Sequence, residues 1–366
     1  MAEIRTIRIN QLKPGMTVSG DIANEQGVVV LFNDSILDEK AIQKLSGQGI
    51  EFVRIVLRDD EVLKLDEPIN YPAVASGPRV LSTAERQTDI KQQYLTGISN
   101  LKGVIYGISM GKTVELHHVH EIAKIISTSF STIGDAISCL NQVREIDEYT
   151  YAHSMNVATL CSLLGGWLNL PPLQIKQLTY CGLLHDIGKS KISSDILLKP
   201  GKLSPKEIEE IRMHPVYGYK VLEKSTTINP EIAKGVLLHH EREDGSGYPF
   251  GLTGEKIPLF AKIVGIVDTF DAMTANRSFQ NRSTPFDVMD MFRSEYLTKC
   301  DPGIMMTFMR HISAYYIGQN VRLSNGETAE IIYINPIFIS KPILKTASNV
   351  IIDLSSAQNL KIAEML

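Results

Sequence analysis

Two pairs of adjacent residues in the second half of the chain could bind metal ions. His185 and Asp186 form the first pair, and His239 and His240 form the second. Imidazole and carboxylate groups suit first-row cations such as iron, manganese and zinc. Five of the nine histidines fall in this stretch, and the candidate ligands are His153, His185, Asp186, His214, His239, His240 and Asp268. The sequence therefore predicts a metal centre assembled from several segments.

The residues around these pairs indicate whether the pairs are metal ligands or hydrogen-bonded residues of the hydrophobic core. Residues 180–184 before His185 are apolar enough to predict a buried helix face. Burying an imidazole and a carboxylate there is costly without a partner, and a cation supplies one. A lone buried histidine is more often a hydrogen-bonded core residue, and Asp268 alone could be an ion-paired helix carboxylate. Seven such residues in one region favour the metal site.

The spacing of these residues through residues 145–300 resembles the HD-GYP family of cyclic di-GMP phosphodiesterases. Gly247, Tyr248 and Pro249 match the GYP signature of that family. The resemblance implies two divalent metal ions, iron or manganese, that share Asp186. The first ion would be held by His153, His185, Asp186 and Asp268, and the second by Asp186, His214, His239 and His240. Such a pair generates a hydroxide at neutral pH for in-line attack on a phosphodiester.

Other residues have expected roles toward the substrate. Lys189 follows Asp186 by three positions and shares its helix face, so it could contact the phosphate or deliver a proton to the leaving alkoxide. The alternative is a solvated surface lysine. Tyr248 offers a ring to a base and a hydroxyl to a phosphate, although glycine-rich loops are often only loops. Arg277 resembles the family arginine that meets the phosphate or guanine.

The chain departs from the family pattern at two places. The family often has Pro-Tyr-Lys or Pro-Tyr-Arg after the arginine, whereas this chain has Gln280 at the cation position, for which Arg282 could compensate. Members with three metals carry a glutamate four residues before the first ligand histidine. That position is Tyr149 here, and a neutral phenol is a poor ligand for Fe(II) or Mn(II), so two metals are expected.

The implied activity is hydrolysis of cyclic di-GMP to linear pGpG, and to GMP where the product is cut again. One alternative is an HD phosphohydrolase that acts on another cyclic dinucleotide. Another is a non-catalytic sensor that binds cyclic di-GMP and signals through a partner protein. The complete ligand set argues against the sensor, because binding alone needs no water-activating metal pair.

Composition narrows the class of protein. The net charge of −4 argues against a sequence-independent nucleic-acid binder, which needs excess lysine and arginine. The four cysteines form no CxxC pair and are expected to be free buried thiols: Cys139, Cys161, Cys181 and Cys300. The N-terminus lacks the apolar segment of a signal peptide, and no run approaches the ~18 apolar residues of a membrane span. The expected location is the cytoplasm.

At 366 residues the chain is too long for one ordinary domain. The expected fold is mainly α, with a helical-bundle core. Its four parts are an N-terminal α+β regulatory module over 1–66, a linker with connecting helices over 67–130, the HD-GYP phosphohydrolase domain over 131–316, and a C-terminal β appendage over 317–366.

Patterns within these parts predict individual elements. A helix over 38–45 is expected in the first part, and a linker rich in proline over 66–78. Further helices are expected over 83–103 and 116–145, and strands in the tail over 321–323, 329–334 and 350–352. The helices before residue 150 could pair two chains into a homodimer.

The remaining histidines are expected to stay outside the metal centre. His117, His118 and His120 form an H-H-x-H run that could bind a metal but also suits a solvated helix start. His311 is expected to be structural.

Overall fold

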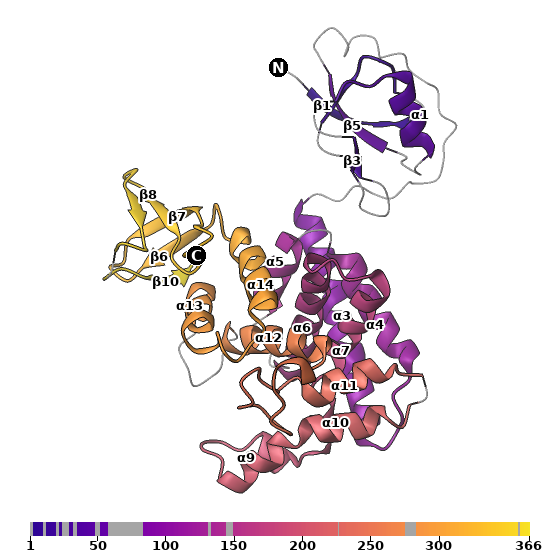
Figure 1. Cartoon of the computed structure of the whole chain (residues 1–366), viewed down its shortest axis with the longest axis vertical. Helices are drawn as coiled ribbons and strands as arrows, with labels where there is room; N and C mark the ends of the chain where they lie inside the picture. Colours follow the sequence, from indigo (N-terminus) through magenta and orange to yellow (C-terminus); the bar gives the residue numbers. More distant parts are fainter. Residues whose placement is uncertain are drawn as a thin grey trace. The chain divides into compact units, whose positions relative to one another are not determined.

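The computed structural model describes residues 3–9, 12–19, 22–23, 29–31, 35–47, 52–57, 83–130, 133–143, 149–225, 227–274, 283–357 and 359–366. The chain divides into two compact units, residues 1–80 and 81–366 (Figure 1). The predicted linker over 66–78 lies outside the described residues. The second unit includes both the predicted connecting helices and the C-terminal strands, which therefore pack with the helical domain.

The first unit is a small α+β module, as predicted. The central strand of its three-stranded antiparallel sheet is β5, and the elements are β1 (Glu3–Arg8), β2 (Thr17–Val18), β3 (Ile22–Ala23), β4 (Val29–Leu31), α1 (Glu39–Gly47) and β5 (Phe52–Leu57). Alternate residues of β5, Val53 and Ile55, are buried against Leu45 of α1. This is the expected pattern for a strand with one face on the core.

The second unit is mainly helical. Its helices, in chain order, are α3 (Thr83–Ser109), α4 (Leu116–Ser129), α5 (Ile133–Val143), α6 (Tyr149–Trp167), α7 (Pro172–Leu184), η2 (Ile187–Lys191), α8 (Ser194–Leu197), α9 (Pro205–Arg212), α10 (His214–Leu222), α11 (Pro230–Leu238), η3 (Gly254–Lys256), α12 (Leu259–Thr274), α13 (Pro285–Glu295) and α14 (Pro302–Tyr315). No helix among the described residues is long and apolar enough to cross a bilayer.

Local sequence signals fix where several of these helices begin. Ser204 and Thr284 start α9 and α13 with capping boxes, in which the side chain three residues later returns a hydrogen bond to the cap backbone. A proline follows each cap, at a position where its missing N–H costs nothing. The starts of α9 and α13 are therefore specified by the local sequence.

The prediction of one continuous helix over 116–145 is wrong. α4 ends at Ser129, Phe130 adopts extended backbone angles, and α5 begins at Ile133. The hydroxyls of Ser127 and Thr128 both donate to the carbonyl of Lys124, and such back-bonding weakens a helix end. The extended Phe130 places its ring 6.1 Å from that of Tyr94, within the core.

The tail forms a five-stranded antiparallel sheet in the order β10-β6-β7-β8-β9. The strands are β6 (Asn320–Leu323), β7 (Thr328–Tyr333), β8 (Ile343–Thr346), β9 (Ile351–Asp353) and β10 (Ile362–Met365). β8 and β10 were not predicted. The hydroxyl of Ser340 donates to Asp290 of α13 at 2.9 Å, and the buried side chains of the sheet are part of the main core.

Candidate metal centre

Five segments of the helical unit each bring candidate ligands to one buried place. α6 carries His153, the end of α7 is followed by His185 and Asp186, α10 begins at His214, α11 is followed by His239 and His240, and α12 carries Asp268. All seven predicted ligands thus lie close together: one group is His153, His185 and Asp268, a second is His214, His239 and His240, and a third is His185, Asp186 and His239. Within each group the potential ligand atoms lie within 4.8 Å of one another.

The carboxylate of Asp186 lies between the first two groups. Its Oδ1 is 3.3 Å from Nε2 of His214. Its Oδ2 is 3.4 Å from Nε2 of His185 and 3.9 Å from Nε2 of His153. One oxygen therefore faces each group, which is the arrangement that a bridging ligand requires.

Backbone carbonyls orient three of the histidines. Nδ1 of His185, His214 and His239 lies 2.8, 2.7 and 2.7 Å from the carbonyl oxygen three residues earlier, at Gly182, Ile211 and Val236. A carbonyl only accepts hydrogen bonds, so each Nδ1 carries a proton and Nε2 is the nitrogen left to bind a metal. This outer support is typical of histidines that bind metals.

Three ring nitrogens in the cluster are placed to bind a cation. Nε2 of His185 is buried and has no hydrogen-bond partner among the described residues. Nε2 of His214 and Nε2 of His239 are 3.4 Å apart, although neither neutral ring can donate through that nitrogen. A cation held between these lone pairs would satisfy them. The donor set of imidazole and carboxylate is also the set that suits first-row divalent metals.

The pKa values of the candidate ligand histidines are shifted in opposite directions within the cluster. Burial alone would lower the pKa of His153, but its hydrogen bonds to Asp268 and Asp271 raise that pKa well above its usual value. Burial, helped by the neighbouring imidazoles, lowers the pKa of His239 well below its usual value. Burial also lowers the pKa of His240 to about 3. His239 and His240 are therefore neutral at pH 7, the state in which imidazole can coordinate a metal.

Comparison with known proteins identifies the fold around this cluster. Residues 139–304 match the HD domain family. This region therefore resembles an HD domain. A cyclic di-GMP phosphodiesterase of Pseudomonas aeruginosa is 33% identical over 61% of the chain and 54% of its own length. A cyclic di-GMP phosphodiesterase of Thermotoga maritima is 37% identical over 40% of both chains. The chain thus spans about half the length of the first relative and less of the second.

Two further relatives extend the comparison. A 3'3'-cGAMP-specific phosphodiesterase of Vibrio cholerae is 28% identical over 78% of the chain and 70% of its own length. A solved structure, described as an HDG"Y"P protein from Bdellovibrio bacteriovorus, superposes with a TM-score of 0.53 at 15% identity, over 84% of this chain and 98% of that one. This likeness shows that the two chains share a fold. HD domains are metal-dependent, in agreement with the His and Asp groups of this chain.

Lys189 lies beside the Asp186 carboxylate, at the centre of the candidate ligands. Its Nζ is 2.6 Å from Oδ2 of Asp186, and its side chain is 32% exposed. Burial would raise the pKa of Asp186, but Lys189 and His185 hold that pKa well below its usual value. η2 can bring these residues to the site because Gly188 has no side chain: a Cβ there would lie 1.9 Å from the carbonyl oxygen of His214.

The GYP loop, residues 245–254, packs against the metal centre. The ring of Tyr248 stacks on His240, with 4.6 Å between the centroids and 26° between the planes. The peptide bond between Tyr248 and Pro249 is cis. A Cβ at Gly247 would lie 2.5 Å from the backbone of residues 240–242, so only glycine allows this approach. The guanidinium of Arg212 lies 5.4 Å from the centroid of the Tyr248 ring.

Sequence reasoning missed the residues that support the site from outside. The buried carboxylate of Glu241 accepts hydrogen bonds from the backbone N–H groups of Phe250 at 2.7 Å and Leu252 at 2.8 Å. Asp271 accepts from Nδ1 of His153 at 2.7 Å, and Asn156 donates to the other oxygen of Asp271 at 2.9 Å. The acidic run of Glu241, Glu243 and Asp244 ahead of the glycine-rich loop was the one signal, and it does not single out Glu241.

Several predicted substrate residues lie outside the described part of the chain. These are Arg277, Gln280 and Arg282. The side chain of Tyr149, which bears on the number of metals, also lies outside the described part, although α6 begins at this residue. Their expected roles stay predictions.

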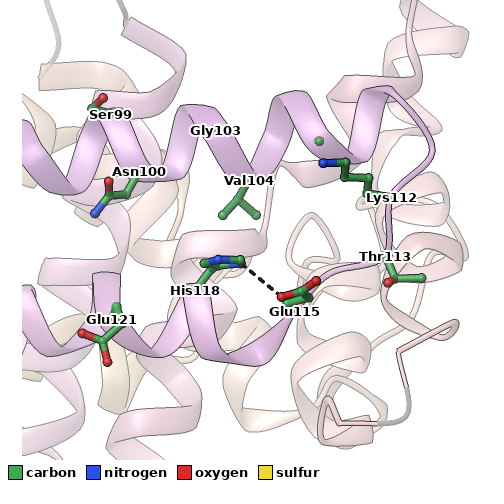
Figure 2. A pocket seen from close by; sticks show the side chains of 10 residues that line it. Ser99, Asn100, Gly103, Val104, Lys112, Thr113, Glu115, His118 and Glu121 are labelled. Atoms are coloured by element: carbon green, nitrogen blue, oxygen red, sulfur yellow. Dashed lines mark ion pairs between the residues drawn. The ribbon is translucent and has the colours of Figure 1, made fainter.

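A separate pocket of about 590 Å³ lies between α3 and α4 (Figure 2). It is lined by residues of both helices and of the turn that joins them, including His118, whose Nδ1 is 3.6 Å from the carboxylate of Glu115. None of its lining residues is a candidate ligand. The H-H-x-H run belongs to no metal-ligand group of the described residues: His117 and His118 are exposed, and His120 contacts the Tyr180 hydroxyl at 2.9 Å. His311 stacks on Trp167 at 4.6 Å.

Proposed function

We propose that residues 139–304 form an HD-GYP domain, and that it is a metal-dependent phosphodiesterase that hydrolyses cyclic di-GMP to pGpG. The observation that carries the proposal is the pair of histidine groups on either side of the Asp186 carboxylate, one facing each oxygen. This arrangement suits two cations that share a ligand, and such pairs act on phosphate esters. The names of the relatives from Pseudomonas aeruginosa and Thermotoga maritima supply the substrate.

The proposed metals are two iron or manganese ions. The ligands of the first would be His153, His185, Asp186 and Asp268, and those of the second Asp186, His214, His239 and His240. When bound, the two ions would supply Lewis acidity toward water and toward the phosphate oxygens. The proposal of two ions rather than three rests on Tyr149, which stands where a third ion would need a carboxylate.

The residues of the chain would then hold the substrate and move protons. The ammonium of Lys189, 2.6 Å from Asp186, would meet the scissile phosphate or donate a proton to the leaving alkoxide. Tyr248, fixed by stacking on His240, would offer its hydroxyl or ring to the nucleotide. Gly247 and Pro249 would shape the loop that carries Tyr248, and Arg277 would contact phosphate or guanine.

A second candidate substrate is 3'3'-cGAMP. The observation that favours it is the relative from Vibrio cholerae, whose alignment of 309 residues covers more of this chain than those of the two cyclic di-GMP phosphodiesterases. Both substrates carry two phosphodiester bonds, so the metal centre alone does not distinguish them.

One assay separates the candidates. Purified full-length protein is supplied with Mn²⁺ or Fe²⁺ and given cyclic di-GMP, 3'3'-cGAMP or pGpG in parallel, and the products are separated by chromatography. Faster hydrolysis of 3'3'-cGAMP would establish the second candidate. Metal and cyclic di-GMP binding without any hydrolysis would instead establish a sensor that acts through a partner protein.

We also propose that α3 and neighbouring helices before residue 150 pair two chains. α3 and the turn after it expose Tyr106 and Met110 to two thirds of their surface, at 66% and 67%. Light scattering of the full-length protein and of a Tyr106→Ser, Met110→Ser variant tests this, and equal masses would contradict it. The cytoplasmic location stays a prediction.

A further inference from the structure

A series of buried polar contacts connects α3 to the metal centre. The hydroxyl of Tyr94 on α3 donates to Oδ1 of Asn156 on α6. Nδ2 of Asn156 donates to Oδ1 of Asp271 at 2.9 Å. Oδ2 of Asp271 accepts from Nδ1 of His153 at 2.7 Å. Each of these four residues exposes 5% of its surface or less.

Each contact in the series fixes the next one. A carboxamide has an accepting end and a donating end, so the Tyr94 hydroxyl on Oδ1 of Asn156 turns Nδ2 toward Asp271. The reversed amide would set Oδ1 of Asn156 against an oxygen of Asp271, and two acceptors repel each other. Asp271 in turn holds the proton of His153 on Nδ1, which leaves Nε2 for the first metal site. Buried networks of this kind act as a unit.

We propose that Tyr94 is a positioning residue of the metal centre, acting on His153 through Asn156 and Asp271. The inference deepens the proposed function, because it assumes that His153 binds a metal. Tyr94 lies before residue 139, where the match to the HD domain family begins. A helix outside the matched domain therefore takes part in orienting a metal ligand.

The Tyr94→Phe variant tests this with little change of shape. Tyr94 is fully buried and its ring packs edge-on against Phe130, and phenylalanine retains that packing. Full-length protein freed of metal by a chelator is titrated with Mn²⁺ in a calorimeter. We expect about tenfold weaker binding at one site, because loss of outer support typically weakens metal binding by about 10- to 100-fold. Asp271→Asn should weaken the same site at least as much.

The double variant separates positioning from general stability. If Tyr94 acts through Asp271, then Tyr94→Phe should weaken Mn²⁺ binding no further once Asp271→Asn is present. The control is Tyr180→Phe, which removes another buried hydroxyl, bonded to His120 at 2.9 Å, and should leave Mn²⁺ binding unchanged. Melting temperatures of the metal-free variants measure stability independently.

Three results would overturn the inference. The first is a Tyr94→Phe protein with a lower melting temperature and unchanged Mn²⁺ affinity, which would make Tyr94 merely structural. The second is an additive loss in the double variant. The third is a wild-type protein that binds no Mn²⁺ or Fe²⁺, which would also remove the proposed function. A protein that binds Mn²⁺ without hydrolysing cyclic dinucleotides would refute only the proposed function.

Discussion

The Glu241 carboxylate should control how well the GYP loop is ordered over the metal centre. Its two oxygens accept from the backbone N–H groups of Phe250 and Leu252, at 2.7 and 2.8 Å. Glu241→Gln retains the size of the side chain but replaces one oxygen with an NH₂ group. That group can only donate, so one of the two backbone N–H groups would face another donor.

Glu241→Gln should lower the free energy that holds the GYP loop in place, because it disturbs both backbone hydrogen bonds. A hydrogen bond to a charged group contributes about 1.5–3 kcal/mol, and glutamine loses one such bond and weakens the other. The hydrogen bond from the Phe250 N–H is only partly buried, so this N–H can turn to water, which favours the lower end of the range. A loss of about 1.5–2 kcal/mol corresponds to roughly 10- to 30-fold in the equilibrium constant between the ordered and the disordered loop, at about 1.4 kcal/mol per factor of ten. KM for the cyclic dinucleotide should then rise about tenfold, because only the ordered loop presents Tyr248.

Steady-state kinetics and elemental analysis of the same preparation check this expectation. The metal content and kcat should stay near wild-type values, because the change acts on the loop. Glu255→Gln, an exposed glutamate of η3 within the same chain region, is the matched control and should leave KM unchanged. A KM within twofold of wild type, or a Glu241→Gln protein without metal, would refute the loop-anchor reasoning.

Four other outcomes follow from the structure. Asp186→Ala should abolish metal binding and hydrolysis together, since its oxygens face both histidine groups, and activity above a tenth of wild type would exclude a bridging role. Lys189→Ala should lower kcat by about 10²- to 10⁴-fold with unchanged metal content, whereas an unchanged kcat would make it a surface lysine. Gly188→Ala should destabilise the protein by about 3 kcal/mol in denaturant melts, because its Cβ would meet backbone on α10, while Gly103→Ala, with open space around it, should not. The four cysteines should resist thiol reagents at pH 8 until the protein unfolds, since burial raises the pKa of Cys139 to about 12 and of Cys300 to about 11 and the thiols stay protonated; labelling of the native protein would contradict this.

The gathering of the candidate ligands at one place was predictable from sequence, because their types and spacing follow a family pattern. The structure shows the physical basis of that spacing: His185, His214 and His239 each lie at a helix boundary, where the ring can bond the carbonyl three residues earlier. The fold class was predictable as well, because proline and capping residues mark helix starts and because the tail changes to strand patterns.

The outer support of the site was not predictable in this way. Asp271 and Asn156 are separated by 115 positions, and Tyr94 lies a further 62 positions before Asn156. Their polar groups meet only after α3, α6 and α12 have packed, so no local pattern connects them. The break between α4 and α5 was also missed, because the apolar period continues across residue 130 while the hydroxyls of Ser127 and Thr128 weaken the helix there.

The HD dipeptide acquires its chemistry from the turn that follows it. Within a continuous helix, His185 and Asp186 would point about 100° apart. α7 instead ends at Leu184, and Asp186 adopts backbone angles of −96° and 6° as the chain enters η2. The N–H of Lys189 bonds to the carbonyl of Asp186 in that turn, so the lysine ammonium returns to the Asp186 carboxylate. Gly188 lets the same turn touch the backbone at His214, which places the second histidine group beside the other oxygen of Asp186. The position of the Asp186 carboxylate between the two histidine groups therefore depends on the backbone of the whole segment 184–189. Placing a His-Asp pair in another helix would not reproduce it.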